Sequence, residues 1–235
     1  MLKKYLLIAT ALVLFVGSSC ENKDENTNIN IENEKPGRPL SRELIKGVRL
    51  GASQEEWEKN VPYKDRVTKL KWKGKEYEFS YYADKDYENG EICRLSLTNS
   101  QNSINIETIA DIYSQKYVVM PLDTDIGRLQ AELLFTVKKG IESGCYEDDN
   151  LSRSYAVGQI LSTYIFFYDS EEDILIVLRS TPKEYQNESN VVNIAYQYKH
   201  DWVLKTQESI ESNKRHLELF LYNKRNEEIN EIGEF

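Results

Sequence analysis

The chain has 235 residues, a formal net charge of -9 at pH 7 and a hydrophobic content of 40%. An acidic surface repels phosphate backbones, which argues against nucleic acid as a partner. The length is sufficient for one domain, or two small fused units, with a real core. The 16 tyrosines favour a sheet-rich fold, because aromatic side chains pack well on pleated strands.

The first 19 residues have the three parts of an export signal. Lys3 and Lys4 form a basic start, residues 5–16 are apolar, and small residues precede Cys20. The apolar stretch is shorter than the ~20 residues that a membrane-spanning helix needs. We therefore expect residues 1–19 to be a signal peptide, whose removal would make the net charge two units more negative.

Cys20 indicates how this signal is processed. Gly17 and Ser19 would also suit an ordinary signal peptidase, which would release a plain secreted chain. A cysteine directly after small residues instead resembles the lipobox of bacterial lipoproteins, although Gly17 stands where that family usually has Leu or Val. The resemblance implies that the Cys20 thiol is the lipid attachment site, carrying a diacylglycerol and palmitate, and that Cys20 becomes the mature N-terminus.

The residues after Cys20 suggest a location and a tether. Residues 21–25 (ENKDE) resemble the tag of Bacteroidetes-type lipoproteins that are exported to the outer face of the outer membrane, which implies an outer-membrane, surface-exposed protein. Residues 20–39 have almost no large apolar side chains, so they cannot offset the entropy of ordering and are expected to form a flexible tether. We expect a globular domain over residues 40–200.

The first unit of this domain, residues 44–99, opens with a capping signal. Ser53 followed three residues later by Glu56 is a capping box, which predicts a short helix starting at Ser53. Apolar and polar residues then alternate over residues 70–81, which predicts two strands that each bury one face. Gly74-Lys75 is expected to form the tight turn between them.

A third strand follows in residues 91–99 (EICRLSLTN). In it Cys93, Leu95 and Leu97 alternate, so we expect them on one buried face, with Cys93 as a thiol in the core. Export also permits a disulfide between Cys93 and Cys145. The sequence leaves this pairing open, because it does not place Cys145 within bonding range.

The same order of elements recurs in residues 103–200. Asn105 is expected to cap a second helix whose apolar stripe starts at Ile106. An extra amphipathic segment follows, read as an inserted helix that ends near Gly140 or Gly144, although its LLFTV stretch is also compatible with a strand. Three further strands are expected in residues 159–169, 173–180 and 190–199.

The tail, residues 201–235, combines sparse apolar positions with dense charge and predicts a long, mostly solvated C-terminal helix. The expected fold class is therefore α+β. It consists of two tandem helix-plus-antiparallel-sheet (αβββ-like) units, with an inserted helix and the long C-terminal helix.

Residues of the first unit also resemble a known group of proteins. The pattern Gly47, Gly51, Ser53 and Glu56 before a hairpin is similar to the small lipoproteins of the outer-membrane β-barrel assembly machinery and to β-lactamase-inhibitor-like domains, over about residues 44–99. The second unit is more similar to uncharacterised lipoproteins of Bacteroidetes. The first resemblance implies a protein that binds other proteins and has no catalytic activity, which is an inference from fold analogy.

The sequence contains no recognisable catalytic constellation. Its two histidines, His200 and His216, lie in or beside the predicted terminal helix with a spacing unlike that of zinc ligands. The acidic clusters are expected to form solvated loops and turns. We expect no catalytic residues, no metal and no cofactor. Six tyrosines are candidates to line a carbohydrate or peptide groove, although packing on strands explains most of them: Tyr81, Tyr82, Tyr155, Tyr164, Tyr168 and Tyr198.

The expected function is that of a lipid-anchored cell-envelope protein acting as a non-catalytic binding or scaffolding module. Its expected partners are the membrane, through the anchor, and an envelope protein. Two alternatives remain open: a surface lipoprotein that binds or hydrolyses glycans or peptides, and an immunity or inhibitor lipoprotein.

Overall fold

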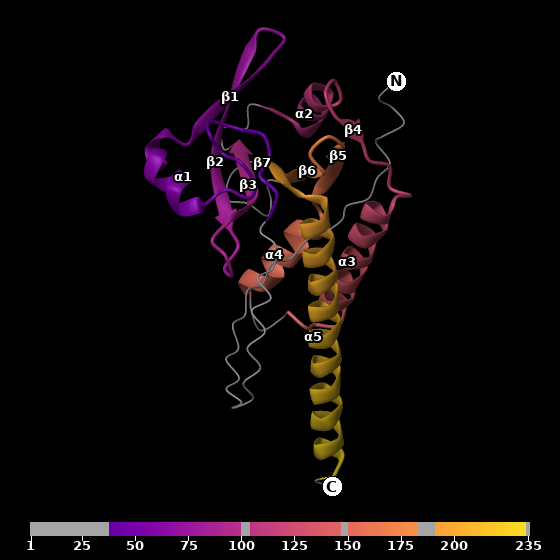
Figure 1. Ribbon diagram of the computed structural model, residues 1–235. Helices are drawn as coiled ribbons and strands as arrows, with labels where there is room; N and C mark the ends of the chain where they lie inside the picture. Colours follow the sequence, from indigo (N-terminus) through magenta and orange to yellow (C-terminus); the bar gives the residue numbers. More distant parts are fainter. Residues whose placement is uncertain (1–37, 100–103, 147–149, 183–190, 234–235) are drawn as a thin grey trace, which may run out of the picture.

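The two predicted units share one antiparallel sheet. The computed structural model describes residues 38–99, 104–146, 150–182 and 191–233. In these residues seven strands lie in the order β1-β2-β3-β7-β6-β5-β4 (Figure 1). In chain order the strands are β1 Val67–Trp72, β2 Lys75–Lys85, β3 Ile92–Asn99, β4 Val118–Val119, β5 Thr163–Asp169, β6 Ile174–Thr181 and β7 Val191–Tyr198.

The units are joined through the last strand of each. Strand β3 pairs antiparallel with β7, with Ser96 opposite Ala195 and Leu97 opposite Ile194. Because side chains alternate across a strand, Leu97 and Ile194 point to one face and Ser96 and Ala195 to the other. This β3–β7 seam makes the predicted tandem units two halves of a single sheet, and the α+β fold class is confirmed.

One face of the sheet carries the main core. Two helices cover it, α1 (Gln54–Asn60) and α2 (Ile106–Tyr113). Their caps are the predicted ones: the Ser53 hydroxyl accepts from the backbone N–H of Glu56, and the Asn105 side chain accepts from that of Thr108. Buried aromatic and aliphatic side chains from both helices and all the central strands form one cluster, which includes Trp57, Tyr81, Leu97, Ile109, Tyr113, Phe167 and Ile194.

The opposite face is covered by three helices. These are α3 (Asp125–Glu142), α4 (Asn150–Ile160) and α5 (Lys199–Gly233), and α3 lies alongside α5 (Figure 1). Ile126 and Trp202 pack on Phe166 and Leu175, so apolar contact is concentrated over β5 and β6. The part of this face over β2, β3 and β7 therefore has polar side chains beneath the helices.

Helix α5 is the long terminal helix that the sequence predicted. Its first turns are buried through Trp202 and Ile210, and the Lys214 ammonium pairs with the Glu132 carboxylate of α3 at 2.7 Å. Farther along, Leu219 and Tyr222 are exposed, and the helix runs past the body (Figure 1). Within the described part of the chain, none of the helices combines the length and apolarity that crossing a membrane requires.

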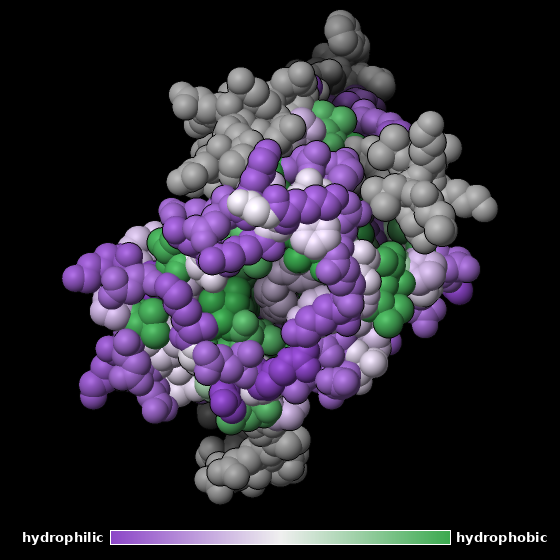
Figure 2. All heavy atoms as spheres, turned by 90° about the horizontal axis from the view of Figure 1, so that it is seen from above, coloured by the Kyte–Doolittle hydropathy of each residue, from purple (hydrophilic) through white to green (hydrophobic). Residues whose placement is uncertain are grey.

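Viewed from above, the molecular surface is mainly hydrophilic (Figure 2). Hydrophobic residues appear in recesses between hydrophilic ones rather than as one broad patch. This distribution fits a chain in which 29% of residues are charged and whose apolar side chains are gathered in buried clusters.

The inserted segment is helical throughout α3, so the alternative of a partly extended segment is wrong. The helix ends at Glu142, and Gly144 follows with a φ of 80°, a left-handed conformation that glycine adopts without strain. Thr124 caps the other end of the helix, since its hydroxyl accepts from the backbone N–H of Gly127.

Two local predictions need correction. The first hairpin turns at Lys73-Gly74, one residue earlier than expected, because both residues take the positive φ that this two-residue turn requires and Lys75 already belongs to β2. Residues 159–160 were expected to begin a strand but end α4, and β5 starts only at Thr163.

Candidate functional site

Arg38 attaches the first described residues to the folded domain. Its guanidinium donates to Asp201 at 2.7 Å and to Asp86 at 2.5 Å, and its backbone N–H donates to the Glu91 carboxylate at 3.1 Å. These acids come from the β2–β3 loop and from α5. Arg38 and Pro39 were expected to belong to the tether, but Arg38 binds these acids and the Pro39 carbonyl accepts from the Tyr198 hydroxyl at 2.5 Å.

Arg42 repeats this arrangement at the β5–β6 hairpin. Its guanidinium pairs with Asp169 and Glu171, and its backbone N–H donates to Glu172 at 3.0 Å. The acidic turn that the sequence presents as solvated therefore holds an arginine from the N-terminal segment. The two arginines attach this segment to both halves of the sheet.

Replacement of Arg38 by alanine is expected to destabilise the fold. Three carboxylates would lose their shared cation, while the Arg38 side chain is 17% exposed, so we expect a loss of about 1–3 kcal/mol in the free energy of unfolding. Urea unfolding at pH 7 measures this loss. The control is Arg49→Ala, because Arg49 is exposed and should change the free energy by less than about 0.5 kcal/mol.

The same variant should show a defined pH dependence. The pKa of Asp86 is held below its usual range by a hydrogen bond from the Glu88 backbone N–H and by Arg38. A lowered carboxyl pKa stabilises the fold above the unfolded-state pKa of about 4, and this contribution is lost as the pH falls through the folded value. The difference between wild type and Arg38→Ala should therefore shrink between pH 5 and pH 2, and a constant difference would show that these carboxylates do not carry the effect.

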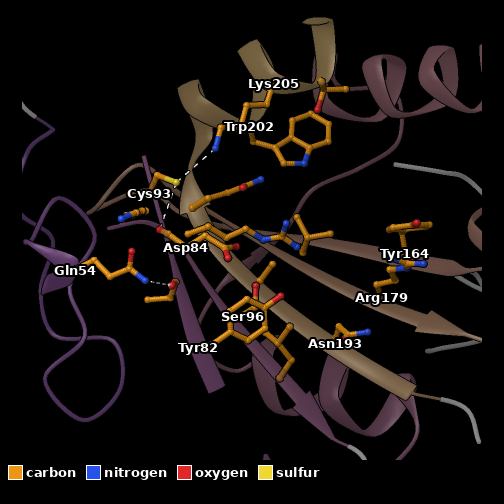
Figure 3. A pocket seen from close by; sticks show the side chains of 18 of the residues that line it. Gln54, Tyr82, Asp84, Cys93, Ser96, Tyr164, Arg179, Asn193, Trp202 and Lys205 are labelled. Carbon is orange, nitrogen blue, oxygen red and sulfur yellow. Dashed lines mark hydrogen bonds between the residues drawn. The ribbon is translucent and has the colours of Figure 1, made fainter. Parts of the chain in front are cut away.

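A pocket of about 630 Å³ lies between the sheet and the helices α4 and α5. Trp202 and Lys205 point from α5 toward the strands that carry Asp84 and Ser96 (Figure 3). Its volume is in the range typical of small-molecule sites. The strands contribute its floor: Tyr82 and Asp84 from β2, Cys93, Arg94 and Ser96 from β3, Asn193, Ala195 and Gln197 from β7, Val177 and Arg179 from β6, and Tyr164 from β5.

The floor of the pocket contains buried polar atoms without a hydrogen-bond partner. Ser96 is 5% exposed, and its hydroxyl has no partner among the described residues. The Arg94 Nε is likewise buried and unpartnered. Leaving such a group unsatisfied costs about 1–3 kcal/mol. A ligand that hydrogen-bonds to Arg94 and Ser96 would offset this cost.

Three other polar side chains of the pocket have partners. The Lys205 ammonium lies 3.5 Å from the Cys93 Sγ, and the Arg179 Nε lies 3.4 Å from the Ser162 hydroxyl. The Asn193 side-chain oxygen accepts from the Thr98 hydroxyl at 2.7 Å. Arg94 Nε and Ser96 Oγ are thus buried polar atoms of the pocket that have no partner among the described residues.

Burial affects two ionisable side chains that face this pocket. It raises the pKa of the Asp84 carboxyl, although Arg94 and Lys205 partly oppose that shift. Burial also raises the pKa of the Cys93 thiol, against the effect of Lys205. Because the thiolate is the nucleophilic form, a raised pKa keeps Cys93 unreactive at neutral pH.

The expected position of Cys93 requires a correction. Leu95 and Leu97 belong to the main core, but Cys93 is buried on the opposite face, where it lines the pocket. The cause is a β-bulge: Asp84 pairs with Arg94 and Lys85 with Ile92, so Cys93 is an extra residue and the alternation breaks there. Cys93 and Cys145 are both free thiols in the structure.

The structure brings together three of the six candidate tyrosines. Tyr82, Tyr155 and Tyr164 line the pocket. Tyr81 and Tyr198 belong to the main core, and the Tyr168 hydroxyl donates to Asp173 at 2.7 Å. Cys20, the signal peptide and residues 21–37 lie outside the described residues.

Arg94 and Ser96 are site residues that sequence reasoning missed. Both lie on the face of β3 opposite Leu95 and Leu97, and polar residues that alternate with core residues usually face solvent.

The described ranges contain no group of three or more metal-ligating side chains. Comparison of the chain with protein-family models, with curated proteins and with solved structures gives no match.

Proposed function

We propose that this protein is a lipid-anchored cell-envelope protein that acts as a non-catalytic binding module, with the pocket between the sheet, α4 and α5 as its ligand site. The Cys20 lipobox-like sequence supports the anchor. The observation that carries the binding role is the pair of unpartnered buried groups, Ser96 Oγ and Arg94 Nε, in a pocket of about 630 Å³.

The chemistry of the pocket favours binding over catalysis. Asp84 is the one carboxylate among the described residues that line it, whereas glycoside hydrolysis with paired carboxylates needs two across the scissile bond. The raised pKa of Cys93 opposes a role as nucleophile. The hydroxyl and guanidinium donors of Ser96 and Arg94 suit recognition of an acceptor group.

A photo-crosslinking experiment in living cells tests this proposal. The photoreactive residue p-benzoylphenylalanine replaces Tyr82, which lines the pocket and is 45% exposed, or Tyr63, which is 82% exposed and does not line it. We expect a discrete adduct from position 82 and none of that mass from position 63. Failure to obtain an adduct at position 82, or the same adduct from both positions, would refute the pocket as ligand site.

A further inference from the structure

The pocket has the opposite charge balance to the whole chain. The chain carries a formal charge of -9, whereas the pocket is lined by one acid, Asp84, and by four basic residues: Lys85, Arg94, Arg179 and Lys205. A cavity lined mainly by one sign of charge focuses the field within it and attracts the opposite sign. An acidic protein with this local excess of cations has a site suited to anions.

Arg94 is the cation in this pocket with the geometry to bind an oxyanion directly. Among the described residues it makes no salt bridge, and its buried Nε is unpartnered. The Nε–H and a neighbouring Nη–H of a guanidinium lie parallel and match the two oxygens of a carboxylate or phosphate. Ser96, two residues along the same face of β3, adds a hydroxyl donor that has no partner among the described residues.

The aromatic residues that line the pocket indicate that the anionic group belongs to a small organic molecule. Trp202 packs edge-on against Phe166 with ring centroids 5.6 Å apart and lines the pocket beside Tyr82 and Tyr155. Aromatic side chains bind flat apolar or sugar-like surfaces, whereas a bare inorganic ion would leave them without contact.

We infer that the ligand is a small organic anion whose carboxylate or phosphate binds Arg94 and Ser96 and whose body rests on the aromatic side chains of the pocket. This inference rests on the proposed binding function and names the chemical class of its ligand. Asp84, which lies opposite Arg94 in the β2–β3 pair, lowers the affinity when it is ionised, because its negative charge repels the anion.

Titration of the full-length protein followed by NMR of the arginine Nε–H groups tests the inference. The probes are benzoate, phenyl phosphate and neutral benzamide, which differ in the charged group but share the ring. We expect a saturable shift of the Arg94 Nε–H resonance with benzoate or phenyl phosphate and none with benzamide. Whichever of benzoate and phenyl phosphate binds with the higher affinity shows whether the site prefers a carboxylate or a phosphate. Arg49 is exposed and serves as the internal control, with a small, non-saturating shift.

Two variants make the assignment specific. Because Arg94→Gln removes a charge-assisted hydrogen bond, it should weaken anion binding by about tenfold or more. The change in intrinsic fluorescence on titration measures this affinity. Asp84→Asn removes the opposing charge without changing the shape of the side chain, so it should strengthen binding by about threefold. An Arg94→Gln chain that does not fold would leave Asp84→Asn as the deciding variant.

The inference is overturned if neither anion gives a saturable shift, if benzamide binds as well as benzoate, or if Asp84→Asn leaves anion affinity unchanged at a pH high enough to ionise Asp84. These outcomes are distinct from failure of the proposed function. Crosslinks from position 82 without anion binding would mean that the pocket takes a neutral ligand, whereas absence of those crosslinks would remove the binding function itself.

Discussion

Replacement of Cys20 by serine is expected to abolish incorporation of radiolabelled palmitate and to release the protein from the membrane fraction. The proposed anchor is the acylated thiol, and each buried CH₂ group of an acyl chain contributes about 0.8 kcal/mol to membrane binding. A multiply acylated cysteine therefore holds the protein firmly on the membrane. Serine has no thiol to acylate. The loss should accordingly be complete.

The matched control for this experiment is Cys145→Ser. Cys145 is a partly exposed free thiol in the turn that follows α3, so its replacement should leave palmitate labelling unchanged. Mass spectrometry of the mature N-terminus gives an independent reading. A mature chain that begins at a residue other than 20, or palmitate label that persists in Cys20→Ser, would contradict the anchor.

Replacement of Leu97 by alanine is expected to lower the free energy of unfolding by about 3–4 kcal/mol, because a large-to-small change in a tightly packed core leaves a cavity. Leu97 is 0% exposed and lies between Tyr81 of β2 and Ile194 of β7. The site belongs to the β3–β7 seam, so the cavity weakens the contact between the two halves of the sheet. Chemical denaturation followed by both fluorescence and circular dichroism measures the change.

The control is Leu219→Ala on α5, which makes the same chemical change at a side chain that is 56% exposed. It should cost less than about 0.5 kcal/mol. Because one core crosses the seam, Leu97→Ala should still unfold in a single transition that both probes report alike. Two separated transitions would show that the halves are independent domains, and equal losses for both variants would contradict the burial of Leu97.

Local patterns predicted much of the fold because their causes are local. The caps at Ser53 and Asn105 depend on residues within one helical turn, and both helices start where those residues stand. The alternation of Tyr77, Phe79 and Tyr81 with polar residues likewise predicts the buried face of β2. Each of these signals is complete within about ten residues of sequence.

Helix α4 lacked such a signal. Its buried positions include Ala156, Gly158 and Gln159, which are small or polar, so no stripe of large apolar side chains marks its inner face. The neighbouring Ile160 instead reads as the beginning of the aromatic strand that follows. The structure accommodates small residues there because α4 packs against α3, where Ala156 lies close to Val137. How closely two helices approach depends on tertiary packing, so no local pattern in the sequence of α4 indicates it.

Tyr82, Tyr155 and Tyr164 were among the candidate groove residues, but the polar floor of the pocket was not predictable, because its residues occupy polar positions on strands. Arg94 and Asn193 alternate with core residues, as solvent-facing side chains of a sheet do. Only the placement of α4 and α5 over this face encloses them. The bulge that redirects Cys93 is similarly invisible in the sequence, since it depends on the register between β2 and β3.

The long sequence separation between β3 and its partner β7 has a consequence for biogenesis. A chain that leaves the ribosome or a translocation channel N-terminus first can form the β1–β2–β3 meander early, but the inner edge of β3 has no partner until Val191–Tyr198 has emerged. An uncovered edge is a template for intermolecular pairing. Closure of the sheet therefore waits until the long segment between β3 and β7 has also emerged, and a chaperone that shields β3 during that interval would suppress aggregation.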